Sequence, residues 1–386
     1  MKRKICFITG TRAEYGLLRQ LILLASNEKL INSQLLVTGT HLSRSHGLTF
    51  KEIEADGLVI SCKINLKIKG DTSQEVIASM SEGLKGFSKA LSALKPDLVV
   101  LLGDRYEIFS AASAAMILNI PIAHIHGGEI TEGAYDEAMR HSITKMSHLH
   151  FVAAPAYKKR VNQLGENLKN IFLVGGLGVD AIHSVRLMSK VALEKSLNFK
   201  FGTRNLLITM HPETLESNKT SKDHIHELLA ALDGMKDTNF IFTLPNSDSN
   251  NLQIRRAIEK FQKAHSKSTK VFASLGQVRY LSALKFIDGV VGNSSSGLLE
   301  APSFKIGTIN LGARQAGRLK AKSVIDSAFD KKDISKAVKI LYSKVFQNNL
   351  LNVVNPYGRP GASKKILKTI KNFPLEGIIK KKFYDL

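Results

Sequence analysis

The sequence predicts an α/β fold with two Rossmann-like domains, in which parallel sheets are covered by helices. Along most of the 386 residues, short runs of Val, Ile and Leu alternate with longer helical patterns. These runs are continuously apolar, as in strands that are buried on both faces of a parallel sheet. The series stops near the middle of the chain and starts again, and a chain of this length usually forms more than one domain.

The first βα series predicts an N-terminal domain over residues 1–180. Its strands are expected at residues 5–9, 34–37, 58–61, 98–102, 121–125, 149–152 and 171–174, with helical patterns at residues 14–26, 72–94 and 106–118. The second series predicts a C-terminal domain over residues 181–363. Its strands are expected at residues 206–209, 240–243, 270–272, 289–291 and 308–311, with helical patterns at residues 224–232 and 254–264.

Composition and charge argue against several classes of protein. Hydrophobic residues make up 44% of the chain and charged residues 23%, which is typical of a globular protein. No apolar run is long enough to predict a transmembrane helix. Cys6 and Cys62 are the only cysteines, so we expect no disulfide framework and a cytoplasmic location. The net charge of +22 suits an anionic ligand, but no nucleic-acid signature accompanies it. We therefore expect neither a nucleic-acid nor a membrane partner.

Candidate ligand-binding residues follow the strands, because open parallel sheets bind ligands outside the carboxyl ends of their strands. Arg12 lies after the first strand, beside a helix start. It is suited to an anion site, or to a surface pair with a carboxylate. Asp104 follows the strand at residues 98–102 and precedes Arg105. It is either the N-cap of the next helix or a group that contacts substrate.

The densest group of polar residues follows the strand at residues 121–125. Gly127-Gly128 is expected to let the backbone approach a ligand closely, with Glu129 facing that ligand. Asp136 and Arg140 lie one turn apart on a predicted helix, so they form either a surface ion pair or part of a site. The His, Cys and Asp spacing does not match a zinc site, and we predict no metal.

Polar residues also follow the strands of the second domain. His211 is suited to contact a phosphate or to transfer a proton. The stretch 292–297 is rich in glycine and serine and precedes a helix, so it is either a plain helix cap or a set of donors for a phosphate. Glu300 follows closely, where its carboxylate would accept from both hydroxyls of a ribose. Arg314 comes after the last of the predicted strands.

Together these motifs resemble the hydrolysing UDP-N-acetylglucosamine 2-epimerases of sialic acid biosynthesis. The resemblance runs in order over nearly the whole chain. In the first domain it rests on Gly10-Thr11-Arg12-Ala13-Glu14, Leu102-Gly103-Asp104-Arg105, His126-Gly127-Gly128-Glu129, the segment 136–141 and Ser142-Ile143-Thr144-Lys145. In the second domain it rests on His211-Pro212-Glu213-Thr214, Gly292-Asn293-Ser294-Ser295-Ser296-Gly297 and Asn310-Leu311-Gly312-Ala313-Arg314-Gln315. Around Asp104 and Glu129 the sequence resembles the hydrolysing rather than the non-hydrolysing epimerases.

The resemblance implies a glycosyltransferase-B type fold, with the active site in the cleft between the domains. A last helix, at about residues 364–386, would pack back on the first domain. The implied reaction converts UDP-N-acetylglucosamine and water to N-acetylmannosamine and UDP. Its route is elimination of UDP to a 2-acetamidoglucal, followed by addition of water. The resemblance implies no cofactor, and it favours a homodimer or homotetramer.

The resemblance also implies a role for each candidate residue. The catalytic residues would be Asp104, Glu129, Asp136, Arg140 and His211. The substrate-binding residues would be Arg12, Arg105, Leu275, Tyr280, Ser294, Ser295, Gly297, Glu300 and Arg314. In this scheme the serine loop, which is the stretch 292–297, binds the diphosphate and the sugar together with Arg12 and Arg105. Glu300 binds the ribose, and Leu275 and Tyr280 frame the uracil.

Other functions would use parts of the same pattern. A hydrolysing 2-epimerase of UDP-N,N'-diacetylbacillosamine, which serves legionaminic acid synthesis, would use the same residues and differ only near C4 and C6 of the sugar. A glycosyltransferase of this fold would need an acceptor site. A non-catalytic nucleotide-sugar or nucleic-acid binding protein would not require Asp104, Glu129 and Asp136 together.

Overall fold

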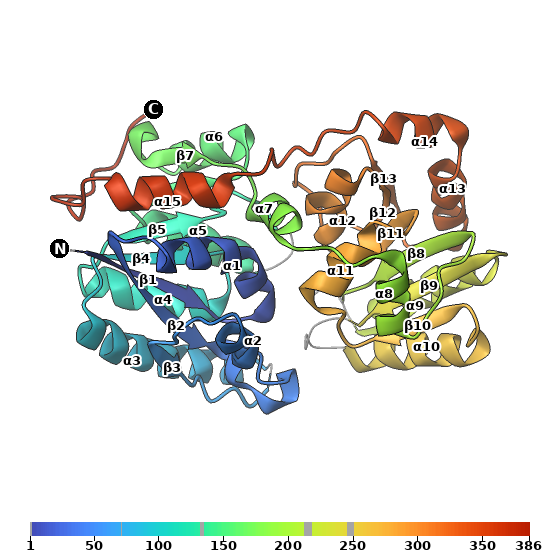
Figure 1. The fold of residues 1–386 in the computed structure, drawn as a ribbon, viewed down its shortest axis with the longest axis horizontal. Helices are drawn as coiled ribbons and strands as arrows, with labels where there is room; N and C mark the ends of the chain where they lie inside the picture. Colours follow the sequence, from blue (N-terminus) through green and yellow to red (C-terminus); the bar gives the residue numbers. More distant parts are fainter. Residues whose placement is uncertain (1, 71, 132–134, 212–217, 245–250) are drawn as a thin grey trace. The chain divides into compact units, whose positions relative to one another are not determined.

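The computed structural model describes residues 2–70, 72–131, 135–211, 218–244 and 251–386, with the side chains of residues 45, 218–221 and 251–252 outside the description. The chain forms two compact units (Figure 1). Unit 1 comprises Met1–Glu129, Tyr135–Ser184 and Tyr357–Leu386, and unit 2 comprises Ile130–Ala134 and Val185–Pro356. Each unit contains its own parallel sheet with helices around it, which confirms the predicted fold class.

Unit 1 contains a seven-stranded sheet in the order β3-β2-β1-β4-β5-β6-β7. Its strands are β1 (Arg3–Thr9), β2 (Ile31–Thr38), β3 (Cys62–Ile64), β4 (Leu98–Leu102), β5 (Ile122–Ile125), β6 (Leu149–Val152) and β7 (Ile171–Leu173). Its helices are α1 (Arg12–Ser26), α2 (Phe50–Ala55), α3 (Ser73–Leu94), α4 (Tyr106–Ile117), α5 (Asp136–Met146), α6 (Pro155–Gln163), α7 (Leu177–Ser184) and α15 (Ala362–Asn372). The strand order reverses between β1 and β4, and ligands of open α/β sheets bind at such a switch point.

Side chains that alternate along β1 enter two different cores, one on each face of the sheet. Ile5 and Phe7 pack with residues of α1 and α15, whereas Cys6 and Ile8 pack with residues of α3 and α4. All four side chains are fully buried. Because both faces are covered, the strand has a continuous apolar run instead of an alternating pattern.

The chain returns to unit 1 through α15, and both ends of this helix are held. At its start, the Asp180 carboxylate accepts from the backbone N–H groups of Gly361, Ala362 and Ser363. At its end, Nη1 of Arg3 donates to the carbonyls of Ile370 and Phe373 at 2.7 and 2.9 Å. A carboxylate at the first turn and a cation at the last carbonyls both complement the helix dipole.

Unit 2 contains a six-stranded sheet in the order β10-β9-β8-β11-β12-β13. Its strands are β8 (Arg204–Thr209), β9 (Thr238–Thr243), β10 (Thr269–Phe272), β11 (Gly289–Gly292), β12 (Gly307–Leu311) and β13 (Val324–Ser327). Its helices are α8 (Lys190–Leu197), α9 (Asn218–Asp233), α10 (Asn251–Ala264), α11 (Gly276–Leu284), α12 (Ser296–Leu299), α13 (Lys331–Leu341) and α14 (Lys344–Leu350). Strands β8, β11 and β12 are neighbours, so their carboxyl ends meet.

Two strand predictions differ from the structure. The strand predicted at residues 58–61 lies instead at Cys62–Ile64. Leu58 and Ile60 do pack into the core, but they do so while the chain approaches the sheet, and pairing with β2 starts only at Cys62. The sequence analysis also missed β13, whose short run Val324–Ser327 contains only two apolar residues.

Candidate functional site

Asp104 and Arg140 meet in unit 1 at the carboxyl ends of β4 and β5. Gly103 has a φ of 85°, which turns the chain directly after β4. The Asp104 carboxylate accepts from Nη2 of Arg140, whose side chain is buried on α5. Helix α4 has Arg105 at its N-cap position, so Asp104 is not the helix cap that its position allowed. The structure therefore brings together two of the predicted catalytic residues.

Asp136 is the first residue of α5, one turn before Arg140. Its negative charge contributes to a raised pKa of Arg105, which is caused chiefly by Glu107 and opposed by burial, with Glu14 adding to it. Arg140 was predicted to form either a surface ion pair with Asp136 or part of a site. In the structure, its guanidinium binds Asp104.

Glu129 is buried, with 3% of its surface exposed, and its Oε1 lies 3.3 Å from Nδ1 of His126. The backbone N–H of Leu177 donates to Nε2 of His126 at 3.4 Å. Nε2 thus accepts a hydrogen bond from the backbone, whereas Oε1 of Glu129 makes no hydrogen bond among the described residues. His126 therefore lies directly beside a predicted catalytic carboxylate.

Gly127 and Gly128 pack closely against the neighbouring helices. A Cβ atom on Gly128 would lie 2.6 Å from the carbonyl oxygen of Tyr157, and one on Gly127 would lie 2.9 Å from Oγ1 of Thr144. The two glycines allow the loop after β5 to pack against α6 and α5. Gly128 also has a φ of 77°, which glycine adopts without strain.

Glu14 and Glu107 form a buried acidic pair that the sequence analysis did not identify. Oε2 of Glu14 accepts from the backbone N–H groups of Gly10 and Thr11 at 2.7 and 3.3 Å. Glu107 is fully buried beside Gly10, and its Oε1 accepts from Nε of Arg105 at 2.9 Å. Burial and the charge of Glu107 raise the pKa of Glu14 to about 8. This pair lies under the end of β1 and holds the predicted substrate-binding residue Arg105.

Arg12 lies beside a carboxylate, and His124 is a buried residue at the end of β5. Nη1 of Arg12 lies 3.8 Å from Oε1 of Glu52, and both side chains are exposed. His124 is fully buried, donating from Nε2 to the Gly103 carbonyl at 2.8 Å and accepting from the Thr144 hydroxyl at 3.0 Å. Burial lowers the pKa of His124 to about 3, so it is a neutral structural residue that supports the turn before Asp104.

In unit 2, His211 and Arg314 lie on either side of Asn293. Asn293 follows β11, His211 follows β8, and Arg314 follows β12. Oδ1 of Asn293 accepts from the backbone N–H of His211 at 2.7 Å, and Nη1 of Arg314 donates to the Asn293 carbonyl at 3.1 Å. Burial, and then the charge of Arg314, lower the pKa of His211 to about 3. At neutral pH the imidazole is therefore uncharged in this structure.

The serine loop contacts Tyr280 and Glu300. The Tyr280 hydroxyl donates to Oγ of Ser296 at 2.5 Å, and Oγ of Ser294 accepts from the Ser296 N–H at 3.4 Å. Burial raises the pKa of Glu300, and a hydrogen bond with Ser296 opposes that rise. Helix α12 has only four residues, so its dipole is small. An anion at this loop would be bound chiefly by hydrogen-bond donors of the loop. Ser295 is at the N-cap of α12.

Two predicted binding residues have structural constraints. A Cβ atom on Gly297 would lie 2.5 Å from Cγ2 of Thr308, so glycine is required there for packing against β12. Leu275 precedes α11 and is buried, with 2% of its surface exposed, and its carbonyl accepts from Nε of Arg279 at 2.7 Å. In this structure the Leu275 side chain is not displayed for contact with a base.

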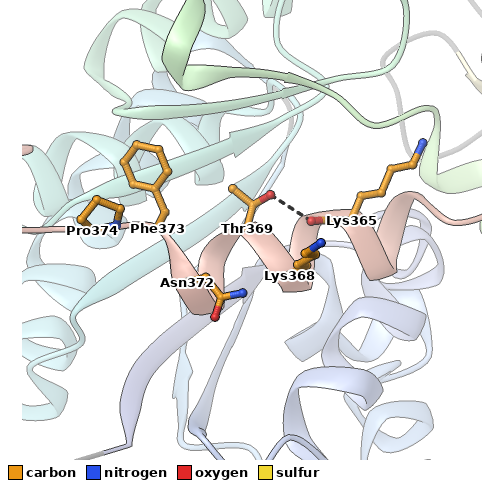
Figure 2. A pocket seen from close by; sticks show the side chains of 6 residues that line it. All are labelled: Lys365, Lys368, Thr369, Asn372, Phe373 and Pro374. Atoms are coloured by element: carbon orange, nitrogen blue, oxygen red, sulfur yellow. Dashed lines mark hydrogen bonds between the residues drawn. The ribbon is translucent and has the colours of Figure 1, made fainter.

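Neither a metal centre nor a membrane span was found in the part of the chain that the structure describes. Among these residues, no group of three or more His, Cys, Asp or Glu is placed to hold a metal ion. Within the same residues, no helix is both long and apolar enough to cross a membrane. A shallow hollow of about 520 Å³ runs along α15 (Figure 2). It is lined by Lys365, Lys368, Thr369, Asn372, Phe373 and Pro374, and it contains none of the predicted site residues.

Comparison with known proteins gives one consistent family. Residues 25–371 match the family model described as UDP-N-acetylglucosamine 2-epimerase. A Campylobacter jejuni protein named GDP/UDP-N,N'-diacetylbacillosamine 2-epimerase (hydrolyzing) is 44% identical over 386 residues, with both chains fully covered. The polysialic acid biosynthesis protein P7 of Escherichia coli is 40% identical, covering 100% of this chain and 98% of its own. A Legionella pneumophila UDP-N,N'-diacetylbacillosamine 2-epimerase (hydrolyzing) is 33% identical, covering 98% of each chain.

Solved structures share the same fold at lower sequence identity. A putative UDP-N-acetylglucosamine 2-epimerase from Listeria monocytogenes has a TM-score of 0.83 at 20% identity, with full coverage of both chains. The Neisseria meningitidis UDP-GlcNAc 2-epimerase bound to UDP-GlcNAc has a TM-score of 0.81 at 19% identity, covering 95% of this chain and 99% of its own. These likenesses establish the fold, which is of the glycosyltransferase-B type.

Proposed function

The chain belongs to the hydrolysing branch of the UDP-N-acetylglucosamine 2-epimerase family, and from this premise we propose that its substrate is UDP-N,N'-diacetylbacillosamine. It is a hydrolysing UDP-sugar 2-epimerase. The choice of sugar rests on the full-length 44% identity to the Campylobacter jejuni relative. The Legionella pneumophila relative, whose name gives the same sugar, adds support.

The proposed reaction has two steps at C1 and C2 of the sugar. In the first, a base removes the C2 proton, the C2 electron pair forms a C1–C2 double bond, and the C1–O bond breaks as UDP leaves. In the second, water adds its oxygen to C1, and an acid delivers a proton to the opposite face of C2. The products are UDP and the free sugar with an inverted C2. These steps need groups that exchange protons at positions close to the sugar.

We assign the proton transfers to unit 1. Asp104, Glu129 and Asp136 are the carboxylates available at the ends of β4 and β5 and the start of α5. Each lies near a basic side chain. Arg140 binds Asp104, Nδ1 of His126 lies 3.3 Å from Glu129, and the negative charge of Asp136 helps to raise the pKa of Arg105. We propose that these carboxylates divide the roles of base and acid between them.

We assign the nucleotide to unit 2, and we propose that Arg12 and Arg105 also bind the diphosphate and the sugar. Ser294, Ser295 and the backbone at Gly297 would donate to the diphosphate. Glu300 would accept from the ribose, next to Ser296 and Tyr280. His211 and Arg314 come from neighbouring strand ends, and they would contact the phosphates as a neutral imidazole and a guanidinium. Leu275 is buried directly before α11, so we assign no contact with the base to its side chain.

UDP-N-acetylglucosamine, the substrate implied by the resemblance, is the second candidate. It is favoured by a UDP-N-acetylglucosamine 2-epimerase of Neisseria meningitidis serogroup B, which is 31% identical over 88% of this chain. The two sugars differ at C4 and C6, away from the bonds that react.

Steady-state kinetics with the two UDP-sugars, and with the GDP-linked diacetylated sugar as a third, tests the substrate. We expect the highest kcat/KM for UDP-N,N'-diacetylbacillosamine, measured by release of nucleotide without an added acceptor. A higher kcat/KM for UDP-N-acetylglucosamine would overturn the proposed sugar and leave the reaction in place. A strict need for an acceptor would indicate a glycosyltransferase instead.

A further inference from the structure

Asn293 has a side chain that is fully buried where the ends of β8 and β11 meet. Its Oδ1 accepts from the backbone N–H of His211 at 2.7 Å, and its Nδ2 donates to the backbone carbonyl of the same residue at 2.8 Å. The amide therefore satisfies both polar groups of one backbone residue. In that way it fixes the segment that carries His211 directly after β8.

The main chain of Asn293 extends this arrangement to the end of β12. Its carbonyl accepts from Nη1 of Arg314 at 3.1 Å and from Nε2 of Gln315 at 2.9 Å. Its N–H donates to the carbonyl of Thr209 at 3.2 Å. One residue thus connects the ends of three neighbouring strands and contacts two of the predicted site residues.

Only an amide of this length suits the position. The His211 backbone presents one donor and one acceptor, and an Asn side chain offers one acceptor and donor hydrogens in the same plane. An ionised Asp offers acceptors alone, and would turn an oxygen toward the His211 carbonyl. Leaving a buried polar group without its partner costs more free energy of folding than the intact hydrogen bond contributes.

We propose that Asn293 is a positioning residue for the nucleotide half of the site. It holds the His211 backbone and the Arg314 guanidinium in the arrangement that binds the diphosphate. The proposal rests on the proposed function, because it takes UDP as the ligand of unit 2.

Asn205 offers a matched control in the same unit. Its Oδ1 accepts from the backbone N–H of Gly202 at 2.8 Å, and its Nδ2 donates to the Gly202 carbonyl at 3.0 Å. It too is buried, with 5% of its surface exposed. Asn205 lies near the start of β8, however, whereas the predicted site residues follow the strand ends. The same substitution at both positions therefore separates damage to the fold from damage to the site.

The experiment compares Asn293→Asp, Asn293→Ala and Asn205→Asp with the unaltered protein, by calorimetric titration with UDP between about pH 5.5 and 8. Near pH 8 we expect Asn293→Asp to bind UDP about tenfold more weakly or worse. A protonated carboxyl again offers one acceptor and one donor, so acidification should bring its affinity back toward that of the unaltered protein at the same pH. Among the described residues, the ionisable ones that contact Asn293 are His211, through its backbone, and Arg314, through the Asn293 carbonyl. The ratio of the two affinities at each pH corrects for the titration of UDP itself.

Asn293→Ala should bind weakly at every pH, and Asn205→Asp should bind UDP normally although its thermal stability falls. Circular dichroism at each pH confirms that the proteins titrated are folded. The proposal is overturned if Asn293→Asp binds like the unaltered protein, if it follows Asn205→Asp at every pH, or if acid fails to restore its affinity. An unaltered protein that does not bind UDP at all would overturn the proposed function first.

Discussion

The two halves of the candidate site are built from different interactions. In unit 1, the strand ends carry charged pairs, in which Arg140 binds Asp104 and Arg105 binds Glu107. In unit 2, amides and hydroxyls dominate, as in the contacts of Asn293 with His211 and of Tyr280 with Ser296. Buried charges are costly unless they are paired, so a protein keeps them where protons or charges must move. Neutral donors suffice where a ligand only has to be held.

Removing the Glu129 carboxylate should have the largest effect on turnover. Normal turnover without it would contradict the assignment of proton transfer to unit 1. Glu129→Gln keeps the size and the burial of the side chain but cannot take up a proton at neutral pH. We expect turnover to fall by roughly 10²- to 10⁴-fold, the usual contribution of an acid or base. Calorimetry should give an unchanged Kd for UDP, because the nucleotide is held by unit 2.

Glu137→Gln is the control for this change, since Glu137 lies on α5 and pairs with His141 at 3.3 Å outside the proposed chemistry. It should turn over substrate at the normal rate. Normal turnover by Glu129→Gln would remove Glu129 from the mechanism.

Arg140→Lys should give the next largest effect. Lysine keeps the positive charge but lacks the planar guanidinium that reaches Asp104 from α5. We expect kcat to fall by about 10- to 100-fold, because a displacement of a catalytic group by about 1 Å is enough for such a loss. The Kd for UDP should stay unchanged. A rise in KM with a normal kcat would instead place Arg140 in substrate binding.

The buried pair of Glu14 and Glu107 predicts a dependence of stability on pH. The pKa of Glu14 is raised from 4.5 to about 8, so the folded state holds a proton that the unfolded state releases above about pH 4.5. Stability should therefore decrease between about pH 4.5 and 8, by up to about 1.4 kcal/mol per pH unit, and level off above that range. Glu14→Gln should remove this slope and be more stable than the unaltered protein at pH 8.

Urea unfolding at several pH values measures this effect, and Glu75→Gln is its control. Glu75 occupies the same capping-box position on α3 that Glu14 occupies on α1, but it is only half-buried, and hydrogen bonds from Thr72 lower its pKa. Replacing Glu75 should therefore leave the slope between pH 5 and 8 intact. Parallel curves for Glu14→Gln and the unaltered protein would show that Glu14 is ionised in the fold.

Tyr280→Phe should have the smallest effect on the kinetics, and it tests whether unit 2 only binds the nucleotide. The change removes one hydroxyl that donates to Ser296 beside Glu300. A single neutral hydrogen bond contributes about 1 kcal/mol, so we expect the KM to rise by roughly two- to tenfold with an unchanged kcat. A large fall in kcat with normal KM would mean that unit 2 takes part in the chemistry.

The sequence predicted the parts of the fold that depend on local pattern. Residues 98–102 and 206–209 were identified as strands because their apolar runs are continuous, and Asp104 and His211 were placed at strand ends for the same reason. Glu14 was missed because the capping-box pattern is the same whether the glutamate is half-buried, as at Glu75, or buried, as at Glu14.

The partners of the site residues depend on long-range contacts that a local pattern does not contain. Asn293 binds a backbone 82 residues away, and Arg140 binds a carboxylate 36 residues away. Gly127-Gly128 was predicted to let a ligand approach closely, and its packing against Thr144 and Tyr157 is a further constraint that the local pattern does not contain. Local residue types thus predicted where the site lies, and the fold determined which groups meet there.

Proton exchange at C2 of the sugar tests the central claim, that the carboxylates of unit 1 remove and return a proton there. The protein is incubated with UDP-N,N'-diacetylbacillosamine in deuterated water, and the released sugar is analysed by NMR. The account predicts free UDP and a sugar with inverted C2 that carries deuterium at that carbon. A released sugar that keeps its original hydrogen and configuration at C2 would contradict it, because the bond to C2 would never have been broken.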